Sequence, residues 1–377
     1  MAASLTLENL DDDGTVEAEE STANESEASL ARPYDPRLIR VEPKMYSLRN
    51  IMDMIEEGEV DLAPDFQRLR VWSPKQKSRL IESVLLRIPL PAFYFASDAE
   101  GRLQVVDGVQ RLSTINEFVR SDESFPLVHL EYLTAEVGGY RFDRLKNSLW
   151  AKRINSTQIV ANVIDPQTPI QVKFDIFKRI NTGGTPLNSQ EIRHCMSGET
   201  SRSLLRRLTT TQEFMQATDG SLLRNVRMAD REMALRVVAF SLLGLDGFLR
   251  RDGLDDFLNF ATQLIDSSPD LIDISQIEDG FARAMRLALQ IFGENAFRKW
   301  PTYPSSRYPI NRAIFEAVGT TLYAAPDSDL REYAKIRELY RELCTEDYGF
   351  IASVTQSTGS PHNVAERFEK IREVILK

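Results

Sequence analysis

Cysteine and histidine are both scarce in this sequence of 377 residues. The two cysteines, Cys195 and Cys344, are too few for a disulfide framework and do not show the spacing of a zinc site. The three histidines, His129, His194 and His362, are too scattered for a histidine metal nuclease or a catalytic triad. We therefore expect a protein without a structural metal, in which both thiols are buried or idle.

Long apolar runs and the common nucleotide motifs are missing as well. No stretch is long enough to cross a bilayer, and the first residues do not show the basic, apolar and small-residue order of a secretory signal. The sequence contains no G-x-x-x-x-G-K-[ST] loop, no G-x-G-x-x-G and no H-E-x-x-H. The first two absences predict a cytoplasmic protein without membrane contact. The missing motifs exclude a P-loop, a dinucleotide-binding fingerprint and a metalloprotease zinc site.

The negative charge is concentrated in the first part of the chain. Residues 1–31 hold nine acidic residues and no lysine or arginine, and removing these nine charges from the total of −10 leaves −1. A nearly neutral body neither indicates nor excludes nucleic acid as a partner. The composition of the tail predicts disorder over residues 1–39, and mimicry of nucleic acid toward a basic partner is the alternative.

Residues 40–198 combine strand and helix patterns. Ser73, Pro74 and Gln76 form a capping box with proline at the first helical position, which predicts a helix start. Two strand-like runs separated by the turn residues 98–101 predict a β-hairpin. The expected elements are helices over 46–57, from 74, after 107 and over 169–180, strands over 92–97, 102–107 and 157–165, and a small hairpin within 125–145.

From about residue 200 the sequence is almost entirely helical in pattern, with few strand signals. We therefore predict an α+β protein, in which an α/β domain over residues 40–198 is followed by an all-helical domain over residues 199–377. The expected helices lie near 201–216, 228–243, 253–266, 275–292, 310–323, 329–344 and 363–376.

The first candidate site is Asp107-Gly108-Val109-Gln110-Arg111, where the second hairpin strand meets the next helix. Gly108 permits a backbone conformation that other residues avoid, and the amides and dipole of a helix start suit an anion. Arg111 can grip phosphate oxygens through two hydrogen bonds, and Asp107 can hold a magnesium ion that bridges phosphates. The alternative, which the spacing alone favours, is a plain turn in which Asp107 caps its own helix.

The second candidate is Asp65-Phe66-Gln67-Arg68, in a polar loop before the capped helix. Gln67 and Arg68 are a natural second source of phosphate or base contacts. The alternative is a surface arginine that packs on Trp72.

The third candidate lies within residues 177–193, where Asn181, Thr182, Gly183 and Gly184 form a loop between two helices. Consecutive glycines can form a concave nest of backbone amides around an oxyanion. An ordinary connection between two helices explains the same residues equally well.

Residues 201–251 hold nine arginines against five acidic residues. This excess of +4 could face nucleic acid, although solvated helix faces explain such an excess more often. Trp72, Trp150 and Trp300 are expected in the core or at an interface and not as platforms for base stacking.

Three stretches together resemble the N-terminal domain of GmrSD-type modification-dependent restriction endonucleases. They are PDFQRLRVWSPKQKSRLIESVLLRIPLPAFYF, VVDGVQRLSTINEF and FKRINTGGTPLNSQEIR. Members typically carry Asp-Gly-Gln-Gln-Arg, and this sequence has Val109 at the third position. The order, spacing and flanking helices agree from about residue 45 to 198, and residues 357–371 are the most family-like part of the helical remainder.

The resemblance implies a ParB/sulfiredoxin-like α/β fold that binds and hydrolyses a nucleoside triphosphate with Mg²⁺. In the family this activity is coupled to the recognition and cutting of modified phage DNA, and cutting belongs to a separate C-terminal H-N-H domain. The sequence shows no counterpart of that domain, since no other histidine in the last third could complete a site with His362 and Asn363. We therefore expect action with DNA and a separate nuclease, without autonomous double-strand cleavage.

These observations lead to one hypothesis for the site. The triphosphate lies on the helix start at Gly108, Asp107 holds magnesium, and Gln110 helps to hold the metal or to align water. Arg111 and Arg68 clamp phosphate oxygens, and Gln67 adds a contact. The loop that closes over the nucleotide consists of Asn181, Thr182, Gly183 and Gly184.

Two other hypotheses for the function remain open at this point. In one, nucleotide binding orders the loops and recruits a separate nuclease without turnover. In the other, the protein is a ParB-like enzyme that nicks DNA directly through Asp65, Asp107 and a metal.

Overall fold

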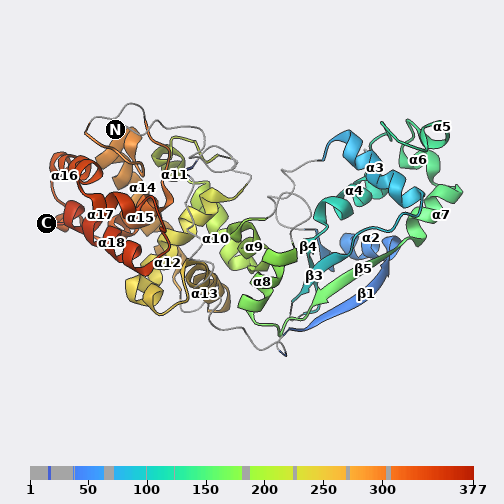
Figure 1. The fold of residues 1–377 in the computed structure, drawn as a ribbon, viewed down its shortest axis with the longest axis horizontal. Helices are drawn as coiled ribbons and strands as arrows, with labels where there is room; N and C mark the ends of the chain where they lie inside the picture. Colours follow the sequence, from blue (N-terminus) through green and yellow to red (C-terminus); the bar gives the residue numbers. More distant parts are fainter. Residues whose placement is uncertain are drawn as a thin grey trace. The chain divides into compact units, whose positions relative to one another are not determined.

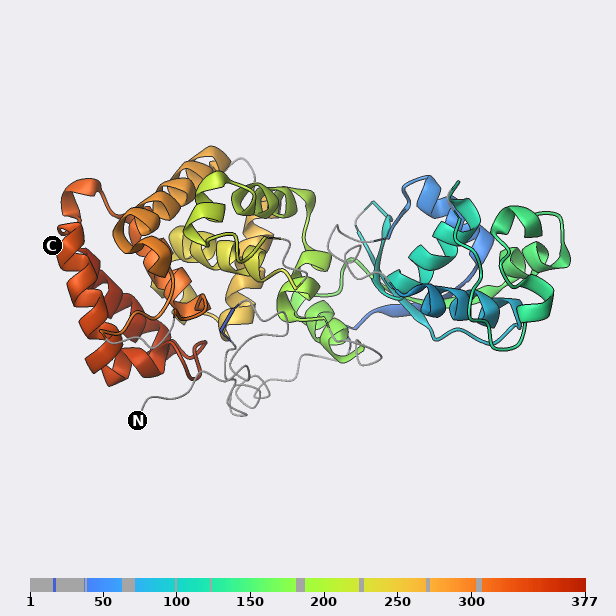
Figure 2. The ribbon, with the colours of Figure 1, turned by 90° about the horizontal axis from the view of Figure 1, so that it is seen from above.

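The computed structural model describes residues 16–17, 37, 39–62, 72–98, 100–122, 124–180, 187–223, 227–268, 272–302 and 307–377. They belong to two units, each of which we describe by itself (Figures 1 and 2). The first, the α/β unit, has the bounds Tyr34–Asn188 and His194–Met196. The second, the helical unit, has the bounds Met1–Pro33, Ser189–Arg193 and Ser197–Lys377. The predicted α+β fold class, with a sheet-containing part followed by a helical part, is confirmed.

A mixed five-stranded sheet forms the centre of the α/β unit, in the order β1 (Val41–Ser47), β5 (Gln158–Ile164), β3 (Phe93–Ser97), β4 (Leu103–Asp107) and β2 (Val60–Asp61). The β1–β5 and β3–β4 pairs are antiparallel, whereas β5–β3 and β4–β2 are parallel. The predicted hairpin is therefore confirmed as β3–β4. At its turn, Asp98 Oδ1 accepts hydrogen bonds from the amides of Glu100 and Arg102.

Local capping signals place the first helices of this unit. Ser47 Oγ accepts a hydrogen bond from the Asn50 amide at the start of α2 (Leu48–Glu56). Ser73 and Gln76 form the predicted capping box of α3 (Pro74–Leu85). The remaining helices are α4 (Val109–Arg120), α5 (Thr134–Val137), α6 (Phe142–Leu145), α7 (Leu149–Ser156) and α8 (Ile170–Ile180).

The small hairpin predicted within residues 125–145 is wrong, because this region forms α5 and α6. The physical reason is Glu82 of α3, whose side chain is buried. Its carboxylate accepts hydrogen bonds of 2.7 to 3.0 Å from the amides of Glu131, Tyr132 and Leu133. These amides are engaged by a side chain and cannot pair with a second strand, and Leu133 begins α5 instead.

The helical unit packs its helices around one large apolar core. The single helix predicted over residues 201–216 is two helices, because Thr211 Oγ1 caps a new helix through the Phe214 amide. The helices are α9 (Ser189–Met196), whose last three residues belong to the α/β unit, α10 (Glu199–Thr209), α11 (Gln212–Ala217), α12 (Ala229–Leu249), α13 (Leu254–Ser267), α14 (Ile274–Phe292), α15 (Arg312–Ala324), α16 (Tyr333–Glu346), α17 (Tyr348–Ser353) and α18 (Pro361–Ile375).

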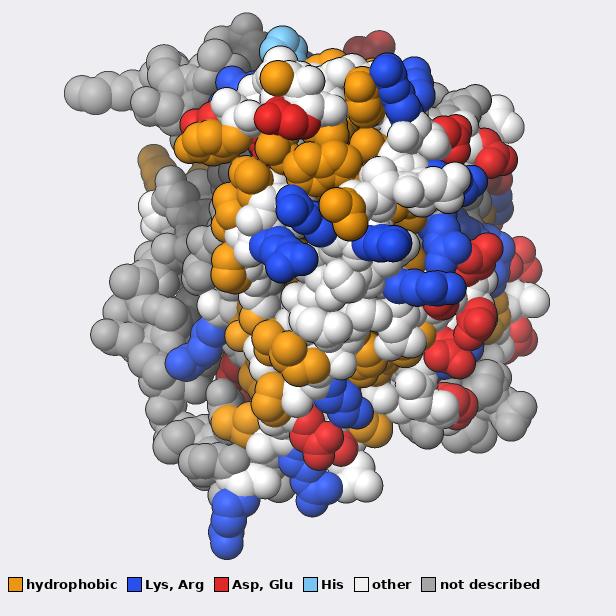
Figure 3. All heavy atoms as spheres, turned by 90° about the vertical axis from the view of Figure 1, so that its right-hand side faces the viewer, with side chains coloured by type: hydrophobic (Ala, Val, Ile, Leu, Met, Phe, Trp, Pro, Cys, Tyr) orange, Lys and Arg blue, Asp and Glu red, His pale blue; other side chains and the backbone are white. Residues whose placement is uncertain are grey.

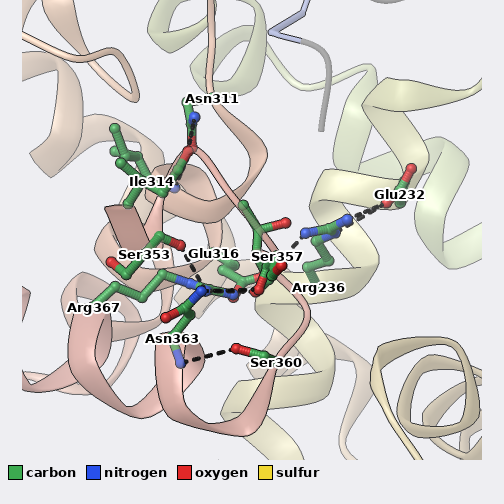
Figure 4. A network of polar contacts seen from close by, with 12 residues as sticks. Glu232, Arg236, Asn311, Ile314, Glu316, Ser353, Ser357, Ser360, Asn363 and Arg367 are labelled. Atoms are coloured by element: carbon green, nitrogen blue, oxygen red, sulfur yellow. Dashed lines mark hydrogen bonds and ion pairs between the residues drawn. The ribbon is translucent and has the colours of Figure 1, made fainter. Parts of the chain in front are cut away.

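Charged side chains connect α12, α15 and α18 inside this core (Figure 4). Glu316 accepts hydrogen bonds from Arg367 through Oε1 and from Arg236 through Oε2, the latter at 3.2 Å. Arg236 also donates to Glu232 Oε1 at 2.6 Å. Because Arg236, Glu316 and Arg367 are almost fully buried, each charge depends on the others for its partner.

Neither Cys195 nor Cys344 is in a disulfide, and both thiols are buried, as expected. Trp72, Trp150 and Trp300 are partly buried and pack against the cores of their units. Over the described parts of the chain, no helix has the length and apolar character that a membrane span requires.

Candidate functional site

The candidate site lies where β4 ends and α4 begins, at the predicted motif. Gly108 is the N-cap residue of α4 and has φ 95° and ψ 9°, in the left-handed region. A Cβ atom at Gly108 would lie 2.2 Å from Cδ1 of Phe93 on the neighbouring strand. Glycine is therefore required at this corner for two reasons, backbone conformation and the close approach of an aromatic ring.

Arg111 is bound tightly into the same corner, with its side chain only 13% exposed. Its Nη1 donates to the Pro91 carbonyl at 2.5 Å, and its Nη2 donates to the Ala92 carbonyl at 3.2 Å and to Asp107 Oδ2 at 2.8 Å. The guanidinium carbon lies 4.3 Å from the centre of the Phe93 ring. Arg111 therefore joins the first turn of α4 to the chain entering β3.

Burial lowers the pKa of Arg111, and the neighbouring carboxylate of Asp107 opposes this shift. An arginine keeps its proton even with a lowered pKa, so a positive charge is fixed beside the helix start. The sequence-based alternative, in which Asp107 caps α4, is wrong. Gly108 is the N-cap residue, and the Asp107 carboxylate binds Arg111 instead.

The first turn of α4 presents backbone amides in a position suited to an anion. The first intrahelical hydrogen bond runs from the Leu112 amide to the Gly108 carbonyl at 2.9 Å. The amides of Val109, Gln110 and Arg111 precede that bond and lie at the positive end of the helix dipole. Gln110 is half-buried within this turn. The structure thus brings together four of the predicted site residues, Asp107, Gly108, Gln110 and Arg111.

The other predicted site residues lie outside the described part of the chain. They are Gln67 and Arg68, with Asp65 beside them, and the loop residues Asn181, Thr182, Gly183 and Gly184.

Among the described residues of this corner, Asp107 can offer a carboxylate to a magnesium ion, and its side chain is about one-third exposed. Throughout the described segments, no three His, Cys, Asp or Glu side chains gather closely enough to hold a metal. Magnesium commonly takes one or two carboxylates and completes its shell with phosphate oxygens and water. Asp107 therefore fits a metal that arrives with a phosphate, and not a resident ion held by protein ligands alone.

Sequence reasoning missed Phe93 and the carbonyls of Pro91 and Ala92 as partners of this corner. One signal was available in the hairpin, because its register pairs Tyr94 with Asp107 and so brings the start of β3 next to Gly108. Nothing in the local pattern shows that Arg111 turns toward these carbonyls, about twenty residues earlier in the chain.

Four arginines of residues 201–251 form ion pairs within the helical unit. Arg202, Arg207 and Arg227 pair with Glu199, Glu278 and Glu191. Arg236 lies in the buried network described above. These four arginines therefore neutralise carboxylates of the helical unit.

The face of the α/β unit around α5, α6 and α7 carries side chains of both signs among apolar ones (Figure 3). Lys146 and Asp143, for example, form an exposed pair with a distance of 3.8 Å. Tyr132 and Leu149 are the most exposed large apolar side chains of this unit. A surface of mixed sign lacks the uniform positive field that steers a polyanion, so this face does not identify a nucleic-acid site.

Comparison with known proteins gives one match. None of the curated proteins compared with the chain matches it. Residues 48–196 match the family model described as the GmrSD restriction endonuclease, N-terminal domain. This range includes the strand–helix corner at residues 107–111 together with the sheet strands β2 to β5. Residues 48–196, which make up most of the α/β unit, are therefore similar to the N-terminal domain of GmrSD restriction endonucleases.

Proposed function

We propose that the protein is a nucleotide-dependent module of a restriction or anti-phage defence system, and that the phosphates of a nucleoside triphosphate bind at the start of α4. The observation that carries this proposal is the geometry of Gly108. As the N-cap residue of α4, Gly108 has no side chain that would fill the space at the helix start, and it lies directly beside the positive charge of Arg111. Helix starts of this kind bind phosphate through backbone amides and the helix dipole.

Within this proposal, Arg111 has two roles. It holds the corner in shape through the carbonyls of Pro91 and Ala92, and it supplies positive charge next to the phosphates. Asp107 would offer a carboxylate oxygen to a magnesium ion, which would neutralise phosphate charge, and Gln110 would align a water molecule. Gln67 and Arg68, with the loop residues 181–184, add contacts to the nucleotide.

Hydrolysis requires little covalent chemistry from such a site. In phosphoryl transfer the water oxygen forms a bond to the γ-phosphorus while the bond to the leaving diphosphate oxygen breaks, and catalysis comes mainly from positioning and charge neutralisation. An arginine, a magnesium ion and a row of amides can supply both. The module would then act with DNA and with a separate nuclease.

The proposal is tested by a thermal-shift panel of nucleoside triphosphates with magnesium, followed by a phosphate-release assay on the triphosphate that stabilises the chain most. Arg111→Ala should weaken binding by on the order of 2 kcal/mol, because a charge-assisted contact is lost. Unchanged binding and turnover in this variant would rule out the corner as the phosphate site.

A control is necessary because Arg111 also supports the fold. Arg153 makes comparable contacts in the same unit, since its guanidinium lies 4.8 Å from the centre of the Trp150 ring and donates to the Leu85 carbonyl. Arg153→Ala should therefore lower thermal stability without changing nucleotide affinity. An equal loss of affinity in both variants would show that the effect of Arg111→Ala is structural.

A second function, a switch that binds nucleotide without hydrolysing it, is favoured by one observation. Asp107 Oδ2 already accepts a hydrogen bond from Arg111, and this ion pair competes with a metal for the carboxylate. Saturable binding without phosphate release would support the switch, and release that depends on Asp107 would support the hydrolase. Magnesium-dependent nicking of supercoiled plasmid without nucleotide would instead support direct DNA cleavage.

A further inference from the structure

Two residues of the acidic tail, for which composition predicts disorder, are placed against the helical unit. Val16 is fully buried in the apolar core of this unit. It forms a parallel β-bridge with Ile310, and the Glu17 amide donates to the Ile310 carbonyl at 2.9 Å. Ile310 forms an antiparallel bridge with Arg298 on its other side. Val16 and Glu17 thus add an extended segment to a short two-stranded ladder.

The side chain of Glu17 is held as specifically as its backbone. Its Oε1 accepts a hydrogen bond from Lys299 Nζ at 2.5 Å, and its Oε2 accepts one from Asn311 Nδ2 at 3.0 Å. Arg312 Nη1 donates to the Glu17 carbonyl at 3.2 Å. Glu17, Lys299 and Arg312 are all mostly shielded from water, so these contacts are stronger than surface ion pairs.

The residues that hold Glu17 are themselves fixed by the helical unit. Asn311 caps α15 through Oδ1, which accepts from the Ile314 amide, and its Nδ2 also donates to the Val354 carbonyl. Lys299 Nζ donates to Thr355 Oγ1 at 2.9 Å. The ammonium and amide groups are therefore held in place by neighbours on the core side, and Glu17 completes their contacts.

The residues that contact Val16 and Glu17 determine which kind of ligand can occupy this site. Removal of Glu17 would leave a poorly solvated ammonium group without its counter-charge, which is costly. The Ile310 edge requires an extended backbone, and the core position of Val16 requires an apolar side chain. We propose that Ile310, Lys299, Asn311 and Arg312 form a binding site for an extended acidic peptide, and that Val16 and Glu17 are its resident ligand.

This proposal does not depend on the nucleotide site. A segment from another protein with the same order, an apolar residue followed by glutamate, enters this site only when the tail leaves it. The tail is then an internal competitor for an acidic peptide.

Binding of a labelled peptide to the full-length chain tests the proposal. The peptide consists of residues 10–24, LDDDGTVEAEESTAN, and fluorescence anisotropy measures its affinity. The variant Val16→Asp places a charge at the buried position and should empty the site. We expect the peptide to bind this variant at least tenfold more tightly than the wild-type chain, whose site is filled.

Two matched peptides separate recognition from simple charge attraction. A peptide with Glu17→Gln should lose most of its affinity, whereas one with Glu20→Gln, which removes the same charge, should keep it. Equal loss in both peptides, or equal binding to the wild-type and Val16→Asp chains, would overturn the proposal.

Hydrogen exchange on the wild-type chain gives a test that needs no variant. The Glu17 amide should exchange more slowly than the amides of residues 19–27, because it donates to the Ile310 carbonyl. Exchange at the same rate as those amides would overturn the proposal, even if the Val16→Asp chain does not fold.

Discussion

At the scale of single residues, the strand–helix corner depends on the absence of one side chain. Gly108 has a positive φ and faces Phe93 at a distance that excludes a Cβ atom. Gly101 in the hairpin turn also has a positive φ, of 85°, but a Cβ atom there would meet nothing within 4 Å. A substitution at Gly101 therefore measures the cost of backbone strain alone, whereas one at Gly108 measures backbone strain together with a steric clash.

We predict that Gly108→Ala destabilises the protein by on the order of 3 kcal/mol, since it adds a clash with Phe93 to an unfavourable φ. Gly101→Ala should cost only about 1 kcal/mol, because it adds backbone strain alone. Urea denaturation of both variants measures these values. Equal costs for the two substitutions would contradict the close packing of Phe93 on Gly108.

A second residue-scale prediction concerns Glu82 and the three amides that it binds. Burial raises the pKa of this carboxyl, but the hydrogen bonds from Glu131, Leu133 and Tyr132, together with the charge of Arg79, outweigh burial and lower it. A lowered pKa in the folded state means that the carboxylate stabilises the fold above its ordinary pKa of 4.5. This stabilisation is lost as the pH falls from 4.5 through the lower pKa of the folded state.

Glu82→Gln should therefore lower the free energy of unfolding by about 2 kcal/mol at pH 7, because the amides lose a charged acceptor. The difference between wild type and variant should shrink as the pH falls below 4.5. Denaturant unfolding across this range measures it, and a difference that stays constant would refute the assigned pKa shift.

At the scale of elements, α9 is anchored to the helical unit by one buried arginine. Arg193 Nε donates to Asn259 Oδ1 at 2.8 Å, Nη1 to Gln190 Oε1 at 2.6 Å and Nη2 to Asp255 Oδ1 at 2.8 Å. A guanidinium can serve three acceptors in one plane, whereas an ammonium group cannot. Arg193 thus fixes α9 to α13, and Ser189 adds a second contact, because its Oγ donates to Asp255 Oδ2 at 3.0 Å.

We predict that Arg193→Lys destabilises α9 by on the order of 3 kcal/mol, because buried acceptors lose their donors. Hydrogen exchange of the backbone amides in α9 and α13 measures this loss of stability at the two helices concerned. Lys335→Ala is the control, since Lys335 and its partner Glu338 are both exposed and such a pair contributes little to stability. Unchanged exchange in the Arg193→Lys variant would show that α9 is held by apolar contacts alone.

At the scale of the whole molecule, the chain has two units with separate cores. Unfolding need not be a single transition in such a protein. The buried network of Arg236, Glu316 and Arg367 lies entirely within the helical unit, so its loss should affect this unit alone.

Glu316→Gln should lower the stability of the helical unit by about 3 to 5 kcal/mol, because two buried arginines lose their shared carboxylate. Differential scanning calorimetry should show a shifted transition for this unit and an unchanged one for the α/β unit. The surface variant Glu338→Gln, which removes an exposed pair with Lys335, should shift neither transition measurably. A shift of both transitions by Glu316→Gln would show that the two units unfold together.

Patterns of short range in the sequence predicted much of this structure. The capping box at Ser73, the hairpin turn at Asp98 and the glycine at position 108 were all placed correctly, because each depends on residues within a few positions. The predicted helix bounds were less exact in the second half of the chain. There, Thr211 caps a new helix and so divides one continuous apolar pattern into two helices.

The sequence by itself determined the fold class, the capped helix α3, the β3–β4 hairpin and the family match, since these follow from local spacing and from motif order. Only the tertiary structure decided which groups the charged side chains contact. Arg111 binds carbonyls about twenty residues away, Glu82 binds amides about fifty residues away, and Glu17 binds side chains almost three hundred residues away. The physical reason is that such partners become neighbours only when apolar burial folds the chain, which no local pattern encodes.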